Sequence, residues 1–170
     1  CLVLAGAGSG KTRVITQKIA HLIEDCGYDA RHIAALTFTN KAAREMKERA
    51  SKLVKGSASK GLTVSTFHNL GLNIIRREHK SLGFKPGFSI FDSEDARSLL
   101  KDLMLKEGDL DNDHLDLVQH QISSWKNDLV NPARALSMAQ SPAEQTIAII
   151  YQRYNQALRA YNAVDFDDLI

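Results

Sequence analysis

The stretch AGAGSGKT, residues 5–12, constrains the fold more than any other part of the 170-residue sequence. It follows a short apolar run, LVLA at 2–5, and precedes an amphipathic pattern over 11–26 that stops at Gly27. A glycine-rich turn between a buried strand and a helix lets backbone N–H groups turn inward, where they can cradle phosphate. We therefore predict an α/β fold that contains a parallel sheet and a phosphate-binding P-loop.

Within this turn, Lys11 is placed to reach the β and γ phosphates of a nucleotide, and the Thr12 hydroxyl to complete a Mg²⁺ shell. The strict P-loop pattern has glycine where this chain has Ala5, but the strand-to-helix context is intact. The alternative is a glycine-rich turn that binds nothing. The predicted catalytic residues are Lys11 and Thr12, and the predicted ATP-binding set is Ala5, Gly6, Ala7, Gly8, Ser9, Gly10, Lys11, Thr12 and Arg13.

The rest of the chain changes character after Gly71. Before it, strand patterns at 32–38 and 62–67 flank a helix pattern at 40–54, as expected for βαβ units. After it, helical periodicity dominates, which predicts an all-helical subdomain inserted into the α/β part or following it. The predicted helices are 68–82, 93–106, 113–127 and 142–162.

Two loops with similar residues follow the second and third predicted strands. The loop TFTNKAA begins at Thr37, and STFHNLG begins at Ser65. Because ligands of such sheets lie outside the carboxyl ends of the strands, both loops should share an edge with the P-loop. Their rings can stack on bases and their polar groups can bind phosphate, although strand-end core residues are the alternative. The predicted contacts to single-stranded DNA are Thr37, Phe38, Thr39, Asn40, Lys41, Thr66, Phe67 and His68.

Charge supports a polyanionic partner for the first half of the chain. Residues 1–80 carry 14 Lys and Arg against 6 Asp and Glu, whereas 81–170 carry 8 against 14. A solvated basic face would produce the same bias. The apolar start is too short for a membrane span or a signal sequence, and Cys1 and Cys26 are typical of buried reduced thiols in a cytoplasmic protein.

These motifs together resemble the N-terminal part of the superfamily 1A DNA helicases, the UvrD/Rep/PcrA group, and most of all its Rep branch. AGAGSGKT resembles motif I, LTFTNKAAREM motif Ia, STFHNLG the TxFH motif, and DFDDLI the short motif before the DExx box. The resemblance spans essentially the whole chain. The adenine-reading glutamine motif, the DExx box and the arginine finger of the family are absent from it.

The resemblance implies a partial RecA-like sheet with 1–70 in subdomain 1A, 71–163 in helical subdomain 1B, and 164–170 returning to 1A. It also implies ATP and Mg²⁺ as cofactors, and 3′→5′ movement along single-stranded DNA with unwinding at junctions with duplex. The partner of the nucleotide site would be a second RecA-like domain of the same protein, with no membrane involved. Residues 1–170 alone should not hydrolyse ATP.

Other interpretations stay open. A RecB/AddA-type helicase–nuclease subunit shares these motifs, a small-molecule kinase shares the P-loop, and a non-catalytic DNA-binding module needs only the loops. In DFDDLI, Asp165 is expected to cap the next helical turn, with Mg²⁺ ligation as the alternative. Trp125 and Lys126 are candidates for duplex contact, although a tryptophan on an apolar helix face usually belongs to the core.

Overall fold

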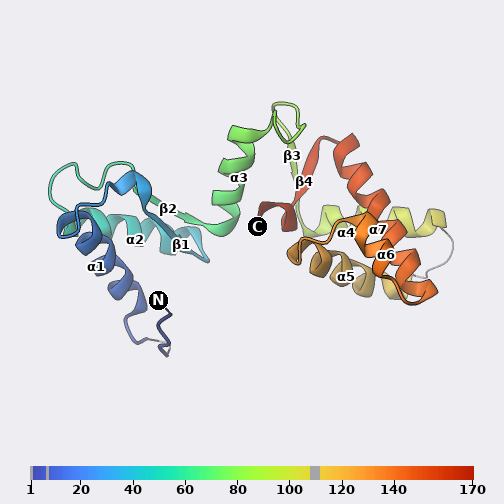
Figure 1. The fold of residues 1–170 in the computed structure, drawn as a ribbon, viewed down its shortest axis with the longest axis horizontal. Coiled ribbons are helices and arrows are strands. Elements are labelled where there is room, and N and C mark those ends of the chain that lie inside the picture. The colour runs from blue at the N-terminus through green and yellow to red at the C-terminus, as the bar shows by residue number, and fades with distance from the viewer. Residues whose placement is uncertain (1, 7, 108–111) are drawn as a thin grey trace. The chain divides into compact units, whose positions relative to one another are not determined.

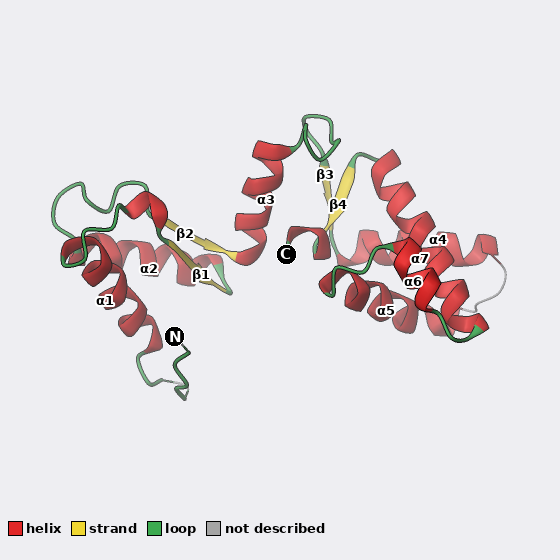
Figure 2. Cartoon of the chain, in the orientation of Figure 1, coloured by secondary structure: helices red, strands yellow, loops and turns green. Residues whose placement is uncertain are grey.

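The computed structural model describes residues 2–6, 8–107 and 112–170, which form two compact units, Cys1–Leu70 and Gly71–Ile170. We call these unit 1 and unit 2. Figure 1 shows the order of their helices and strands along the chain, and Figure 2 shows that helices make up most of unit 2. None of the described helices is both long and apolar enough to cross a membrane.

Unit 1 is a small α/β layer. Strands β1 (Ala34–Thr37) and β2 (Thr63–Thr66) pair in parallel, with Ala34 opposite Thr63 and Thr37 opposite Thr66. The predicted helices form as α1 (Lys11–Glu24) and α2 (Asn40–Leu53), and a 3₁₀ turn, Ala30–His32, precedes β1. The apolar sides of α1 and α2 share a core with β1 and the start of β2. Its buried residues are Ile19, Ile23, Ala30, Ala35, Met46, Ala50, Val54 and Leu62.

Two predictions for unit 1 are wrong. Residues 2–5 form no strand, and Leu2 and Leu4 are 85% and 87% exposed. A strand needs a neighbour to accept and donate its ladder hydrogen bonds, and no described strand pairs with this run. Cys26 is exposed instead of buried, because it lies just past the end of α1, 3.5 Å from His21 Nε2. Cys1 lies outside the described residues.

Unit 2 is a helical assembly with a short parallel ribbon. Its helices are α4 (Ser93–Glu107), α5 (Leu115–Asn127), α6 (Pro132–Met138) and α7 (Pro142–Ala160), with a 3₁₀ turn at Asn112–His114. Strands β3 (Ser89–Phe91) and β4 (Ala163–Asp165) pair with Ile90 opposite Val164. Helix α7 contributes more buried residues than any other described helix, among them Ile150, Tyr154 and Leu158.

Helix α3 (Phe67–Glu78) crosses from one unit to the other, since it begins directly at the end of β2. Within unit 2, Gly71 on α3 lies against the last 3₁₀ turn, Asp167–Leu169. A Cβ atom at position 71 would lie 1.7 Å from the carbonyl oxygen of Leu169, so only glycine permits this approach. A small core of Ile75, Val164 and Leu169 completes the packing here.

Candidate nucleotide and nucleic-acid sites

Two glycines in the turn that begins at Ala5 have a left-handed backbone conformation. Gly8 and Gly10 have φ values of 73° and 83°, a region that glycine adopts at no steric cost. Apart from the neighbouring residues in the chain, no heavy atom lies within 4 Å of an added Cβ at Gly6, Gly8 or Gly10, so the space beside these glycines is open. Ala7, which was predicted to contribute, lies outside the described residues.

Helix α1 begins directly after this turn, with Gly10 as its N-cap and no side chain capping it. The N–H group of Arg13 already donates to the Gly10 carbonyl at 2.8 Å, so the N–H groups of Lys11 and Thr12 are the first-turn donors left for an anion, and the helix dipole favours negative charge there. Ser9 Oγ donates a hydrogen bond to the carbonyl of Gly6 at 2.7 Å, which tightens the turn. These features favour the phosphate-binding interpretation over an idle glycine turn.

Lys11 folds back over the turn. Its Nζ donates to the carbonyl oxygens of Ala5 at 3.0 Å and of Gly6 at 2.6 Å, and the side chain is exposed. The ammonium group therefore already lies over the cradle, where a phosphate would compete with two neutral carbonyls for it. Thr12 is half-buried and Arg13 exposed in the first turn of α1, and Arg13 lines a shallow pocket with Gly8, Ser9 and Gly10.

The described residues fit a magnesium ion held mainly by nucleotide phosphates better than one held by protein side chains alone. No group of three or more metal-ligating side chains occurs among the described residues. Magnesium commonly keeps several waters and takes few protein ligands when phosphate oxygens complete its shell. The Thr12 hydroxyl can serve as one such ligand.

The two predicted DNA loops lie side by side because their strands pair. Phe38 and Phe67 each follow directly after a strand, and their ring centroids are 6.1 Å apart with the planes at 47°. Phe38 is 93% exposed and Phe67 is 43% exposed. Such exposure excludes the alternative in which Phe38 is a core residue, and it leaves a large ring face available to a base.

The threonines of these loops have different roles. Thr37 and Thr66 are buried; Thr37 Oγ1 donates to the carbonyl of Thr39 at 2.9 Å, and Thr66 Oγ1 accepts from the Asn69 amide at 3.3 Å. Both hydroxyls are therefore buried and already hydrogen-bonded within the turns. Neither one presents the phosphate contact that was predicted for it on an exposed surface. The exposed Thr39 caps α2 by accepting from the Ala42 amide.

The remaining predicted contacts, Asn40, Lys41 and His68, are exposed in the first turns of α2 and α3. Asn40 Oδ1 accepts a hydrogen bond from Asn69 Nδ2 at 2.9 Å, which links the two loops. Asn69 was absent from the predicted set. The shared pattern T-F-x-N in TFTN and TFHN was the signal that could have identified it.

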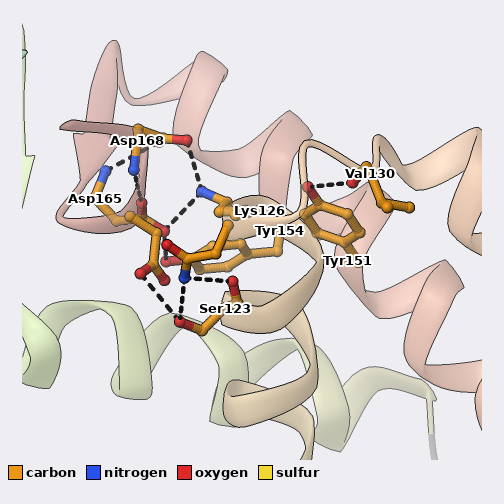
Figure 3. A network of polar contacts seen from close by, with 9 residues as sticks. Ser123, Lys126, Val130, Tyr151, Tyr154, Asp165 and Asp168 are labelled. Atoms are coloured by element: carbon orange, nitrogen blue, oxygen red, sulfur yellow. Dashed lines mark hydrogen bonds and ion pairs between the residues drawn. The ribbon is translucent and has the colours of Figure 1, made fainter. Parts of the chain in front are cut away.

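The acidic motif at the chain's end serves the structure of unit 2 (Figure 3). Lys126 Nζ lies 2.8 Å from Asp165 Oδ2 and 2.8 Å from Asp168 Oδ1, and Tyr154 Oη donates to Asp165 Oδ2 at 2.8 Å. The Asp165 and Lys126 side chains are only 7% and 6% exposed. Asp165 Oδ1 accepts from the Asp168 amide at 2.9 Å and so bonds into the next helical turn as predicted, although the N-cap position of that turn is occupied by Phe166.

Burial and charge act together on the pKa values of this network. Burial alone would lower the pKa of Lys126 and raise that of Asp165, but their mutual attraction outweighs it in both. The pKa of Lys126 is therefore raised and that of Asp165 lowered. Burial and the neighbouring Asp165 charge raise the pKa of Asp168, and burial together with the same charge raises that of Tyr154. The shifts in the pKa values of Lys126, Asp165 and Tyr154 favour the charged lysine, the ionised aspartate and the neutral tyrosine that form the network, whereas the raised pKa of Asp168 disfavours its charged form.

These contacts remove Trp125 and Lys126 from the candidate duplex surface. Lys126 is ion-paired with two carboxylates. The Trp125 ring stacks on Tyr151 at a centroid distance of 5.7 Å and an interplanar angle of 25°. Trp125 packs partly buried against the main core of unit 2. The core interpretation of Trp125 is thereby confirmed.

Comparison with known proteins agrees with this geometry. The family model described as the UvrD/REP helicase N-terminal domain matches residues 1–170. The whole chain is 56% identical to the ATP-dependent DNA helicase Rep of Escherichia coli (strain K12) and to that of Salmonella typhimurium, and covers 25% of each. It is 41% identical over 99% of its length to the ATP-dependent DNA helicase PcrA of Leuconostoc citreum, of which it covers 23%. The chain thus spans about a quarter of the length of these curated relatives.

Proposed function

The chain belongs to the UvrD/REP helicase family, in its N-terminal domain, and on that basis we propose that the full-length protein is an ATP-dependent DNA helicase. It couples ATP hydrolysis to movement along single-stranded DNA and to unwinding of duplex at single-strand/duplex junctions. The observation that carries the proposal is the pair of exposed phenylalanines, Phe38 and Phe67, at the ends of two strands in the same unit as an uncapped phosphate turn.

In this proposal the nucleotide binds at residues 5–13. The turn and the first N–H groups of α1 hold phosphate oxygens, and Lys11 leaves the carbonyls of Ala5 and Gly6 to neutralise the β and γ phosphates. Thr12 contributes its hydroxyl to Mg²⁺, which stabilises charge on the phosphates when bound. The residue that activates water and a finger arginine would come from the rest of the protein.

Single-stranded DNA binds across the two loops. Phe38 offers a stacking face, Asn40 and Lys41 at the start of α2 offer phosphate donors, and His68 does the same from α3. The exposed face of α2 extends this positive surface. Its basic residues are Lys41, Arg44, Lys47, Arg49 and Lys52. Of these, Arg49 is 3.6 Å from Glu45, so part of its charge is already balanced.

The family also suggests how the units correspond to its subdomains. We assign unit 1 to part of the RecA-like subdomain 1A and residues 71–163 to the helical subdomain 1B, with 164–170 leading back towards 1A. We further assign 3′→5′ polarity, a second RecA-like domain elsewhere in the protein, and a cytoplasmic location. The clear T-F-x-N loops favour this motor over a small-molecule kinase, which has no use for them.

A strand-displacement assay on the full-length protein tests the proposal. The substrates are short duplexes with a single-stranded tail on either the 3′ or the 5′ side, incubated with ATP and Mg²⁺. We expect unwinding only from the 3′ tail and none with Lys11→Ala, while Lys18→Ala, a change at an exposed lysine of the same helix, keeps activity. Unwinding from the 5′ tail alone would refute the polarity, and ATP hydrolysis that DNA does not stimulate would refute the motor.

A further inference from the structure

The two DNA loops form a matched pair, position by position. TFTN starts at Thr37 and TFHN starts at Thr66, and these two threonines face each other in the parallel ladder. One residue further on, the rings of Phe38 and Phe67 are in contact. Two residues beyond that, Asn69 Nδ2 donates to Asn40 Oδ1 at 2.9 Å. The register of the strands is thus continued beyond the ladder by side chains.

We propose that Asn69 is a positioning residue that, through Asn40, fixes the two T-F-x-N loops as one rigid surface for single-stranded DNA. This inference rests on the proposed DNA-binding function. The backbone ladder ends at Thr37 and Thr66, so beyond it the side chains provide the cross-loop contacts. Each loop is also anchored on its own helix, because Thr39 caps α2 and Thr66 Oγ1 accepts from the Asn69 amide. The amide pair joins these two anchored ends.

The bridge also determines which face of the Asn40 amide meets DNA. Its Oδ1 is occupied by Asn69, so the two Nδ2 hydrogens of Asn40 remain for other acceptors. A phosphate oxygen is an acceptor only, and therefore requires a donor. Without Asn69, the Asn40 amide can rotate and turn its carbonyl oxygen towards the phosphate, which would repel it.

The geometry of the two rings indicates that a base stacks on one of them and is not held between them. A base held between two rings needs parallel faces about 7 Å apart, twice the usual carbon–carbon contact distance. Phe38 and Phe67 are closer than this and tilted by 47°, so they already pack on each other. Phe38, at 93% exposure, offers its outer face to a base, while the less exposed Phe67 supports it from behind.

The test is a double-mutant cycle on the full-length protein, with the dissociation constant for fluorescent oligo(dT) as the measurement. We expect Asn69→Ala to weaken binding about two- to tenfold, the range for loss of a neutral hydrogen bond. In an Asn40→Ala background, Asn69→Ala should have no further effect, because its partner is gone. Affinity for a non-hydrolysable ATP analogue and the melting temperature should stay unchanged, and Asn73→Ala, an exposed asparagine on the same helix, serves as control.

Asn69→Asp gives a second and sharper variant. A carboxylate at 69 accepts from Asn40 Nδ2, so it turns the Asn40 carbonyl outward and adds negative charge beside the phosphate path. We expect a larger loss of affinity than with Asn69→Ala. The proposal is overturned if Asn69→Ala binds like wild type while Phe38→Ala weakens binding, or if the Asn40→Ala and Asn69→Ala losses simply add. If the wild-type protein fails to bind oligo(dT) at all, the proposed function itself is wrong.

Discussion

Unit 1 leaves Phe38 and Lys11 of its predicted sites exposed to solvent, whereas unit 2 holds Trp125 and Lys126 in internal contacts. Phe38 in unit 1 is 93% exposed, and Lys11 reaches only the carbonyls of its own turn. In unit 2, the Lys126 side chain is 6% exposed between two carboxylates, and Trp125 stacks on Tyr151. Residue type alone therefore does not separate a binding site from a structural network; the partners already satisfied within the protein do.

The largest effect that this comparison predicts comes from breaking the buried network. Lys126→Met leaves Asp165 and Asp168 without their counter-charge, and removal of one partner of a buried pair costs about 3–5 kcal/mol in the free energy of unfolding. Urea unfolding of residues 1–170, followed by the fluorescence of Trp125, measures it. Lys101→Met, at an exposed position of α4, is the control. Equal stability of the two variants would show that the Lys126 network is not structural.

Replacing the lysine in the P-loop of unit 1 should have the opposite effect: activity falls while stability is unchanged. Lys11→Ala should lower the ATP turnover of the full-length protein by about a hundred- to a thousandfold, the usual cost of losing one group that stabilises transition-state charge. Its stability should hold, because the Lys11 side chain is exposed and bonded only to two carbonyls. A phosphate-release assay and a melting curve measure the two quantities. A large drop in melting temperature would assign Lys11 to structure, as for Lys126.

The stability of the protein at alkaline pH gives a finer test of the buried network in unit 2. The pKa values of Lys126 and Tyr154 are both raised in the folded state, so the folded protein keeps two protons that the unfolded chain loses above about pH 10. Stability is fully present below that pH and declines as pH rises, by up to about 1.4 kcal/mol per pH unit for each group. Urea unfolding at a series of pH values should show a shallower decline for Tyr154→Phe. Identical slopes would contradict the assignment.

Local periodicity was enough to predict the longer helices. The predicted 11–26 and 40–54 became Lys11–Glu24 and Asn40–Leu53, because the apolar spacing and the caps lie within each segment. Helix α6 was missed, although Asn131 before Pro132 is a cap signal and its side chain accepts from the Arg134 amide. Strands β3 and β4 have three residues each and pair across more than seventy positions, so no local pattern could indicate them.

The sites were predictable in part for the same reason. The P-loop and the T-F-x-N loops carry their signal in consecutive residues, and the structure leaves Phe38 exposed as a binding role requires. LVLA failed as a strand because a strand depends on a partner that the segment itself does not contain. The Lys126–Asp165 pair joins residues 39 positions apart, so only the packing of α5 against β4 could show that this lysine is not free for DNA.

The most direct test of the account is the dependence of ATP hydrolysis by the full-length protein on oligo(dT) concentration. Stacking contributes about 1–3 kcal/mol per base, so Phe38→Ala should raise the half-saturating oligo(dT) concentration by roughly tenfold or more. The rate at saturating DNA should change little, and Tyr161→Ala, an aromatic of unit 2 that is 62% exposed, should behave like wild type. Half-saturation at the same DNA concentration for Phe38→Ala and wild type would contradict the claim that the exposed loops of unit 1 hold the strand.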